Sequence, residues 1–260
     1  MSPVPTGRQP AGRLDNAVKC ILFDVYGTLF ISDSGDIGIA RSKSKKQFEI
    51  QNLIDQYDLD ATSENLLQIL YDCIQKKHVV LHREGIDFPE IEIDEIWMEI
   101  LNIGDRSTAR LFALEFELIV NPVYPMPHLK DVLESLKMRQ IPMGIISNAQ
   151  FYTLYLFDWF LNGNPKDLGF DAALLFLSYR IKHAKPSTKL FEMAAEKLKQ
   201  KGIPKSCVLY VGNDMRNDIL PAAQTGFQTA LFAGDQRSLR LREDDPECKR
   251  VSPDLVITDL

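Results

Sequence analysis

The stretch KCILFDVYGTLF, residues 19–30, decides how this chain folds. It is an almost continuous apolar run that ends in one carboxylate, Asp24, and a turn around Gly27 follows at once. A strand this apolar is usually covered on both faces, as strands of parallel sheets are. Because ligands of open α/β sheets bind at the carboxyl ends of the strands, a charge at this tip predicts a functional site.

Further apolar runs bounded by turn residues predict more buried strands, and amphipathic segments between them predict helices. The strand-like runs are IPMGIISNA (141–149), DAALLFLS (171–178), CVLYVGND (207–214), QTALFAGD (228–235) and DLVITDL (254–260). The helical segments are 128–140, 188–202 and 218–226. This alternation predicts an α/β fold, with a doubly wound and mostly parallel sheet of the Rossmann-like kind.

One region interrupts the alternation. Residues 34–120 show almost only helical patterns, so we expect a helical cap domain inserted directly after the first strand and its turn. The Rossmann-like core is then formed by residues 19–33 and 121–260. Residues 1–18 contain Pro, Gly and Arg and are expected to form a mobile tail.

Composition narrows the function classes. The 260 residues are 45% hydrophobic and 25% charged, which is typical of a soluble globular protein, and the net charge of −6 argues against nucleic acid as a partner. The four cysteines are far apart, which favours a reduced cytoplasmic protein. No apolar run predicts a signal peptide or a membrane helix. We expect a monomer or homodimer that does not bind membranes.

Polar residues follow the predicted strands in a way that concentrates them at one edge of the sheet. Each has an ordinary structural explanation when taken alone, such as a helix cap or a solvated helix face. Their succession at consecutive strand ends favours one common site. They are Asp24, Ser147, Asn148, Lys185, Asp214 and Asp218.

These residue types suit phosphoryl transfer. A carboxylate such as Asp24 can act as a covalent nucleophile, and Lys185 can neutralise an anionic substrate. Carboxylates of Asp24, Asp214 and Asp218 form the oxygen-rich set that Mg²⁺ prefers. The hydroxyls of Thr28 and Ser147 can hold oxygens of the transferred group.

At this point the chain resembles the haloacid dehalogenase superfamily over nearly its whole length. The resemblance rests on DVYGTL at residues 24–29, on Ser147, on Lys185 within KPS, and on VGNDMRND at residues 211–218. It implies that Asp24 is the nucleophile and that the main-chain carbonyl of residue 26 joins the metal ligands. Gly27 and Asn148 are expected to contact the substrate.

The resemblance leaves the activity open at Tyr26. Phosphatases of this superfamily carry a second Asp there as general acid and base, and tyrosine is a poor substitute because its ordinary pKa is about 10. The motif DVYGTL, with Tyr26 at this position, instead resembles the corresponding motif of the metal-independent 2-haloacid dehalogenases. The spacing of the two acids Asp214 and Asp218 resembles that in the metal-binding phosphatases. Asn213, however, stands directly after Gly212, where an Asp is more usual.

The leading interpretation is a Mg²⁺-dependent phosphatase that acts on a small, anionic, phosphorylated metabolite through an aspartyl intermediate on Asp24. The first alternative is a metal-independent 2-haloacid dehalogenase, in which Lys185 and Ser147 bind the substrate carboxylate. The second alternative is a weakly active or inactive binding protein with the same fold.

Overall fold

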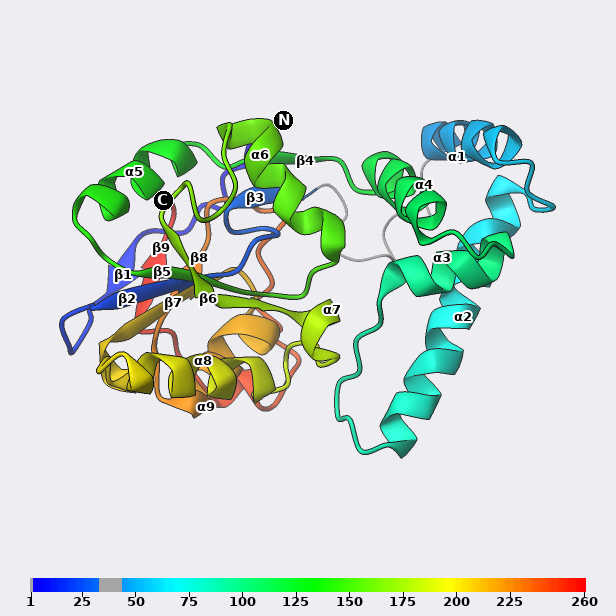
Figure 1. Cartoon of the computed structure of the whole chain (residues 1–260). Coiled ribbons are helices and arrows are strands. Elements are labelled where there is room, and N and C mark those ends of the chain that lie inside the picture. Colours follow the sequence, from blue (N-terminus) through cyan, green and yellow to red (C-terminus); the bar gives the residue numbers. More distant parts are fainter. Residues whose placement is uncertain (1, 33–43) are drawn as a thin grey trace. The chain divides into compact units, whose positions relative to one another are not determined.

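The computed structural model describes residues 2–32 and 44–260, and the chain divides into two compact units. The core unit comprises Met1–Ser32 and Tyr124–Leu260, and the helical unit comprises Asp33–Val123. Residues 34–43 of the predicted helical insertion lie outside the described residues. Each unit is described by itself below (Figure 1).

The core unit is built on a seven-stranded sheet with the order β1-β9-β8-β7-β2-β5-β6. Every pairing is parallel except that of β1 with β9. The strands are β1 (Ala11–Gly12), β2 (Cys20–Phe23), β5 (Met143–Ser147), β6 (Phe170–Leu177), β7 (Val208–Gly212), β8 (Gln228–Phe232) and β9 (Leu255–Ile257). The predicted parallel α/β sheet is therefore confirmed, and all six predicted strands are present.

Helices lie on both faces of this sheet (Figure 1). One face carries α5 (Leu129–Met138) and α6 (Tyr155–Leu161), and the other carries α8 (Lys189–Gln200) and α9 (Leu220–Thr225). The short helix α7 (Ser178–Ile181) directly follows β6. A second, two-stranded sheet pairs β3 (Phe30–Ser32) with β4 (Val123–Pro125). The architecture is the doubly wound one that the sequence predicts.

Helix α8 shows how the sequence pattern produces the packing. Its apolar stripe, Leu190, Phe191, Ala194 and Leu198, is buried in one core cluster with residues of β2 and β7. The charged residues of α8 stay on the opposite, solvated side. Gly202 follows the helix with φ = +74°, the left-handed conformation that ends helices.

The N-terminal segment lies against the core unit, which differs from the mobile tail that the sequence predicts. Residues 11–12 pair with β9, and the Val4 amide donates to the Asp235 carboxylate at 2.7 Å. The Thr6 hydroxyl donates to the Ala233 carbonyl at 2.7 Å. The physical reason is that β9 ends the parallel sheet with unpaired backbone groups, which this segment satisfies.

The helical unit consists of four helices among its described residues, as its apolar periodicity predicts. They are α1 (Ser44–Gln56), α2 (Ser63–Arg83), α3 (Ile93–Leu101) and α4 (Arg106–Val120). Aromatic rings of α3 and α4 form its centre, with Trp97 and Phe112 at 4.6 Å between ring centroids. No helix in the part of the chain that the structure describes has the length and apolar character needed to cross a membrane.

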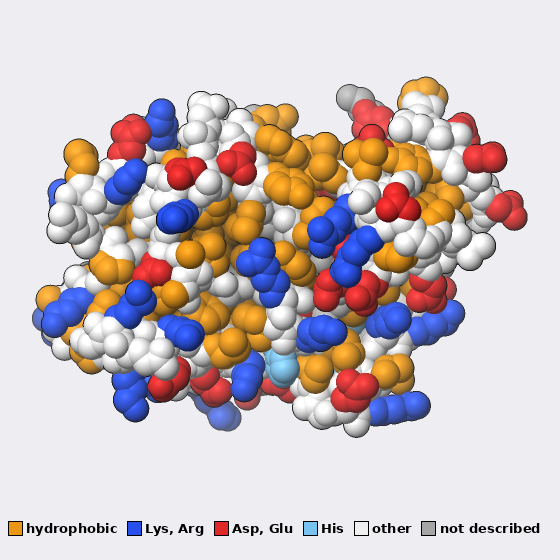
Figure 2. Space-filling view, in the orientation of Figure 1, with side chains coloured by type: hydrophobic (Ala, Val, Ile, Leu, Met, Phe, Trp, Pro, Cys, Tyr) orange, Lys and Arg blue, Asp and Glu red, His pale blue; other side chains and the backbone are white. Residues whose placement is uncertain are grey.

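Charges of both signs are interspersed on the face shown in Figure 2, and hydrophobic side chains lie between them.

In the core unit, α6 buries Leu156 and Phe157 against the sheet, whereas Tyr155 and Trp159 on its other side are exposed. The rings of this exposed pair are 5.9 Å apart. Helix α6 therefore covers the sheet with an apolar side and presents an aromatic side outward.

Candidate active site

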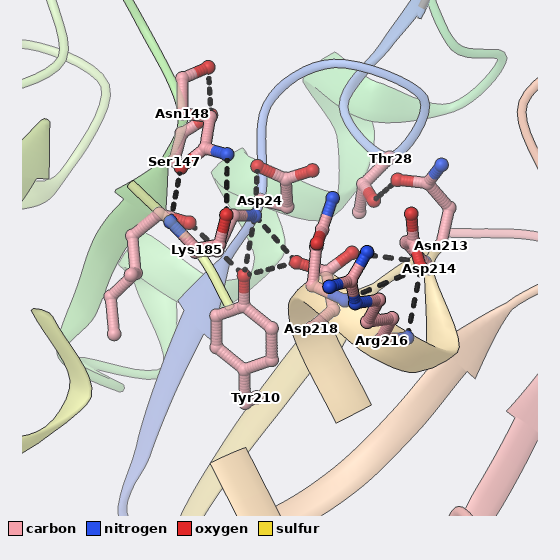
Figure 3. A network of polar contacts seen from close by, with 12 residues as sticks. Asp24, Thr28, Ser147, Asn148, Lys185, Tyr210, Asn213, Asp214, Arg216 and Asp218 are labelled. Carbon is pink, nitrogen blue, oxygen red and sulfur yellow. Dashed lines mark hydrogen bonds and ion pairs between the residues drawn. The ribbon is translucent and has the colours of Figure 1, made fainter. Parts of the chain in front are cut away.

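The candidate site lies at the carboxyl ends of adjacent parallel strands in the core unit. Asp24 directly follows β2, which pairs with β5 on one side and β7 on the other. Ser147 ends β5, and Asn213 and Asp214 follow β7. Lys185 comes from the loop after α7. The topology thus brings together residues from four parts of the chain, as the strand ends predict (Figure 3).

The turn after Asp24 is held by its own backbone and by the β7 end. The amides of Leu29 and Phe30 both donate to the Val25 carbonyl, at 3.0 and 2.9 Å. Gly27 has φ = +83°, and a Cβ there would lie 2.5 Å from the side-chain nitrogen Nδ2 of Asn213. Glycine is therefore required for the conformation and for the close approach. Its predicted contact with substrate stays a prediction.

Lys185 is the cation at the centre of the site. Its ammonium nitrogen lies 2.8 Å from Asp24 Oδ1 and also contacts Asp218 Oδ1. A third contact, of 3.2 Å, joins it to the Tyr210 hydroxyl. Asp24 is 7% exposed, Lys185 5% and Asp218 1%. The predicted nucleophile and the predicted cation therefore form a buried ion pair.

Asn148 holds the main chain of Lys185. Its amide nitrogen donates to the Lys185 carbonyl at 3.1 Å, and its amide oxygen accepts from the Lys185 N–H at 2.7 Å. Both ends of the side chain are used in this way. The structure gives Asn148 a part in fixing the Lys185 loop, and its predicted contact with the substrate stays a prediction.

The two predicted hydroxyl groups are both fully buried. Thr28 donates from its hydroxyl to Asn213 Oδ1 at 3.1 Å, which ties the Asp24 turn to the β7 end. Ser147 ends β5, and its hydroxyl contacts the Asn148 carbonyl at 3.4 Å. Figure 3 shows Thr28 beside Asn213 and Ser147 beside Asn148. Their binding of phosphoryl oxygens remains a prediction.

Asp214 and Asp218 have different surroundings although four residues separate them. The Asp218 carboxylate faces the site, where it contacts Lys185 and Tyr210 with Oδ1 and accepts from the Asp214 amide at 2.9 Å with Oδ2. The Asp214 carboxylate accepts from the amides of Arg216 and Asn217 at the start of the following helical turn. The Arg242 guanidinium also binds it, with contacts of 2.6 to 3.2 Å.

The predicted metal ligands are therefore not assembled as one set. Among residues 2–32 and 44–260, no group of three or more His, Cys, Asp or Glu side chains is placed to hold a metal ion. The physical reason is that Arg242 and the helix cap occupy the Asp214 carboxylate, while Lys185 and Tyr210 occupy that of Asp218. Asn213, and not Asp214, has its side-chain oxygen beside the Asp24 turn.

The Tyr26 side chain is held at the edge of the site. Its hydroxyl forms a 3.0 Å hydrogen bond with the Thr153 hydroxyl, in the turn that leads into α6. This side chain ends in a phenol and not in a carboxyl group. Tyr26 therefore offers no carboxylate beside Asp24.

Burial and charge shift the pKa values of this cluster. Burial of Lys185 acts to lower its pKa, but the carboxylates of Asp218 and Asp24 outweigh that effect and raise it. Burial raises the pKa of Asp218 to about 6, and the nearby Asp24 and Asp214 act in the same direction against Lys185. Carboxylates thus outnumber ammonium groups here, and the cluster has an excess of negative charge.

Two groups in the site are missed by sequence reasoning. Tyr210 lies within an apolar run and is indistinguishable there from a core aromatic residue. Arg242 lies in a loop of mixed charge whose pairing with Asp214 depends on the fold. For Tyr210, one sequence signal exists: it lies two residues before the end of β7, and the predicted site residues lie at the ends of the neighbouring strands.

Comparison with known proteins agrees with this geometry. A family model described as haloacid dehalogenase-like hydrolase matches residues 18–226. The chain is 26% identical over 249 residues to the pyrophosphatase PpaX of Oceanobacillus iheyensis, covering 94% of both chains. The chain belongs to the haloacid dehalogenase-like hydrolases.

Solved structures share the fold over almost the whole chain. A 2-haloacid dehalogenase from Pseudomonas syringae pv. tomato superposes with a TM-score of 0.57 at 18% identity, covering 93% of this chain and 94% of that one. An L-2-haloacid dehalogenase from Xanthobacter autotrophicus gives 0.52 at 17% identity, covering 93% and 95%. At these identities the comparison shows a common fold, and the reaction has to be inferred from the site.

Proposed function

We propose that this hydrolase is a phosphatase that releases phosphate from a small, anionic, phosphorylated metabolite of the cytoplasm. The observation that carries the proposal is the buried ion pair between Asp24 and Lys185 at the tip of β2. A carboxylate in this position can attack phosphorus, and the ammonium limits repulsion between the attacking and attacked anions. The full-length similarity to a pyrophosphatase supports the same substrate class.

The proposed reaction has two displacements at phosphorus. One oxygen of Asp24 forms a bond to phosphorus while the bond from phosphorus to the leaving oxygen breaks, which gives an aspartyl phosphate. Water then attacks the same phosphorus, the bond to Asp24 breaks, and phosphate leaves with the carboxylate restored. Lys185 offsets negative charge in both steps, with Thr28 and Ser147 beside the transferred group.

Magnesium is the cofactor we propose for this reaction. When bound, Mg²⁺ neutralises charge on the phosphoryl oxygens. Asp24, the Tyr26 main-chain carbonyl and Asn213 would hold it, with Asp214 outside the ligand set because Arg242 binds its carboxylate. This set contains one negative charge, so we expect weak binding of the metal.

A matched pair of variants tests the ligand assignment without any assay of turnover. Asn213→Asp adds a charge to the ligand set, so we expect Mn²⁺, followed by its EPR signal as a Mg²⁺ substitute, to bind about tenfold tighter. Asp214→Asn should leave Mn²⁺ affinity unchanged. Weaker binding in Asp214→Asn would restore Asp214 to the ligand set and contradict our assignment.

Tyr26 sets the kind of leaving group that we expect. No carboxylic acid at this position protonates the departing oxygen, so the rate should depend steeply on the acidity of the leaving alcohol. Phosphoanhydrides and aryl phosphates meet this requirement better than alkyl phosphates do. Tyr26→Asp should therefore increase turnover of an alkyl phosphate more than that of p-nitrophenyl phosphate.

The helical unit is proposed to act as the cap of this site. Active-site lids exclude water and complete the substrate pocket, and they commonly carry the residues that select the substrate. The helices are inserted between β3 and β4, so the unit connects to the core through two chain segments.

A 2-haloacid dehalogenase is the second candidate, and one observation favours it. Tyr26 and Asn213 stand where phosphatases of the superfamily usually carry an acid; here the Tyr26 hydroxyl bonds to Thr153 and the Asn213 side chain accepts from Thr28, so neither adds a negative charge, as a metal-free reaction at carbon allows. In that reaction Asp24 would displace halide from carbon and form an ester, which water would then cleave at the carboxylate carbon of Asp24.

One paired assay separates these candidates. Phosphate release from p-nitrophenyl phosphate and pyrophosphate, and chloride release from 2-chloropropionate, would each be measured with Mg²⁺ and with EDTA. Asp24→Asn removes the nucleophile, and Asp171→Asn is its matched control because Asp171 pairs with Lys201 at 2.7 Å away from the site. Phosphate release that requires Mg²⁺ and Asp24, but not Asp171, is the expected result.

The other outcomes are equally informative. Chloride release that survives EDTA would overturn the phosphatase proposal in favour of the dehalogenase. Phosphate release that persists in Asp24→Asn would show that Asp24 is not the nucleophile. A protein inactive on all three substrates and on a panel of phosphorylated metabolites would be the binding protein of the second alternative.

A further inference from the structure

Tyr210 places a hydroxyl group inside the charged cluster of the site. It lies on β7, is 0% exposed, and its oxygen is 2.8 Å from Asp218 Oδ1 and 3.2 Å from the Lys185 nitrogen. A third neighbour is the Ile146 carbonyl, at 3.0 Å. Figure 3 shows the hydroxyl pointing between Lys185 and Asp218.

Counting donors and acceptors shows what this hydroxyl does for Lys185. An ammonium group has three N–H donors. The three oxygen atoms within reach are Asp24 Oδ1, Asp218 Oδ1 and the Tyr210 oxygen. Every N–H of Lys185 therefore has one acceptor, and the ammonium is fixed in position.

The same hydroxyl acts on Asp218. Its single proton can point to Asp218 Oδ1 or to the Ile146 carbonyl, because the oxygen accepts from Lys185 on another side. Burial, together with the carboxylates of Asp218 and Asp24, raises the pKa of Tyr210 well above its ordinary value, so the group stays a protonated donor. A proton donated to Asp218 disperses part of that carboxylate's charge.

Asp218 and Asp24 compete for the one ammonium group that lies between them. We propose that Tyr210 is a positioning residue, whose hydroxyl holds Lys185 against the nucleophile Asp24 by accepting from the ammonium and donating to Asp218. Without the hydroxyl, Asp218 attracts Lys185 more strongly and Asp24 is less well neutralised during attack. This inference rests on the proposed function in that it takes Asp24 as the nucleophile.

The packing of the tyrosine ring is separable from the hydroxyl. The ring meets Phe191 edge to face with centroids 5.0 Å apart, within the core cluster that α8 and β7 share. Phenylalanine would keep this contact and remove only the oxygen. Tyr210→Phe is therefore the variant that isolates the proposed role.

The test measures kcat and KM of Tyr210→Phe on p-nitrophenyl phosphate and 2-chloropropionate. We expect kcat to fall about tenfold, the value of one hydrogen bond, with KM nearly unchanged because the fully buried hydroxyl acts through Lys185. Tyr57→Phe is the matched control, since the Tyr57 hydroxyl donates to Glu115 at 2.8 Å within the helical unit. A rise in KM at constant kcat would overturn the proposal.

A second readout needs no turnover. Reductive methylation of Lys185 by formaldehyde and cyanoborohydride, followed by mass spectrometry, measures how firmly the ammonium is held. We expect Lys185 to be modified several-fold more slowly in Tyr210→Phe than in the wild type, because Asp218 then holds its ammonium group more strongly, with the other lysines unchanged. Equal rates would overturn the positioning role. This readout stays valid if neither substrate is turned over, in which case the proposed function fails by itself.

Two further variants separate positioning from stability. In Asp218→Asn the competing charge is gone, so adding Tyr210→Phe should slow Lys185 modification much less than it does in the wild type. Phe191→Leu loosens the ring packing but keeps the hydroxyl, so Lys185 modification should match the wild type. Additive effects in the first case, or slower modification in the second, would show that Tyr210 acts through packing.

Discussion

Two carboxylates of the molecule, Asp94 and Asp218, are buried to the same degree but have opposite electrostatic surroundings. Asp94 of α3 and Asp218 of the core unit are each 1% exposed. Asp94 accepts from two arginines, Arg106 and Arg110, at 2.8 and 2.7 Å. Asp218 instead shares the single ammonium of Lys185 with Asp24.

The pKa values follow this difference. Burial acts to raise the pKa of Asp94, but hydrogen bonds from Arg106 and Arg110 outweigh it, and the net shift is downward. Burial raises the pKa of Asp218, and one lysine shared with Asp24 does not compensate. Asp94 is thus neutralised within the fold, as a structural ion pair requires. The Asp218 cluster keeps an excess of negative charge, which is typical of sites that bind cations or perform chemistry.

The largest effect should come from removing Lys185, the cation that Asp24 and Asp218 share. Lys185→Met leaves Asp24 and Asp218 without a counter-ion, so activity should fall by about 10²–10³-fold. The free energy of unfolding should fall by about 3–5 kcal/mol, because one partner of a buried ion pair is lost. Enzyme assays and urea unfolding measure the two effects.

The matched control for Lys185→Met is Lys201→Met. Lys201 pairs with Asp171 at 2.7 Å, but both side chains are partly exposed, so the loss should be about 0–1 kcal/mol with no change in activity. If the two variants had equal effects, burial and charge imbalance would not distinguish the cluster of Asp24, Lys185 and Asp218 from a surface ion pair.

Asp94→Asn should give the next largest effect, confined to the helical unit. It weakens hydrogen bonds from Arg106 and Arg110 and should cost about 2 kcal/mol, the range for bonds to a charged group. Trp97 lies on the same helix and is 1% exposed, so its fluorescence in a Trp159→Phe background reports unfolding of this unit. An unchanged midpoint would mean that the arginines contribute nothing to stability.

Most of the fold follows from the sequence because the buried strands are almost uninterrupted apolar runs. The β2 run ends in Asp24, and the stripe of α8 predicts its buried face. The N-terminal segment could not be predicted, because its pairing depends on the free edge of β9, which only the assembled sheet exposes. Local sequence specifies elements well, but it does not specify contacts made across the whole chain.

The site shows the same limit. The order of the strands brings Asp24, Lys185 and Asp218 together, and the polar residues at strand ends indicate this. Which acid faces the site is not visible in the spacing of Asp214 and Asp218, because the capping geometry and Arg242 decide it. In the helical unit, Asp94 looks like any acid of an amphipathic helix until α4 supplies its arginines.

Asp214→Asn tests a third kind of carboxylate, one that is paired but lies at the edge of the charged group formed by Asp24, Lys185 and Asp218. Asparagine can still cap the helical turn, so the change removes mainly the ion pair with the partly exposed Arg242, and stability should fall by about 0–1 kcal/mol. Activity should change less than twofold, whereas Asp218→Asn removes a direct partner of Lys185 and should change it by more. Thermal unfolding and parallel assays give the comparison, and equal activity losses in both variants would remove the distinction between the two acids.

The last prediction concerns protonation of Asp94, which does not affect stability at neutral pH and lowers it only in acid. The folded-state pKa of Asp94 lies below its unfolded value, which is about 4, so its contribution to stability is complete above that pH. It is lost as the pH falls through the folded-state value, because the protonated carboxyl no longer pairs with Arg106 and Arg110. Urea unfolding followed by Trp97 should therefore show a loss of stability below about pH 4 that is smaller in Asp94→Asn. The same acid dependence in both proteins would assign the effect to other carboxylates, and the contrast between Asp94 and Asp218 would then rest on geometry alone.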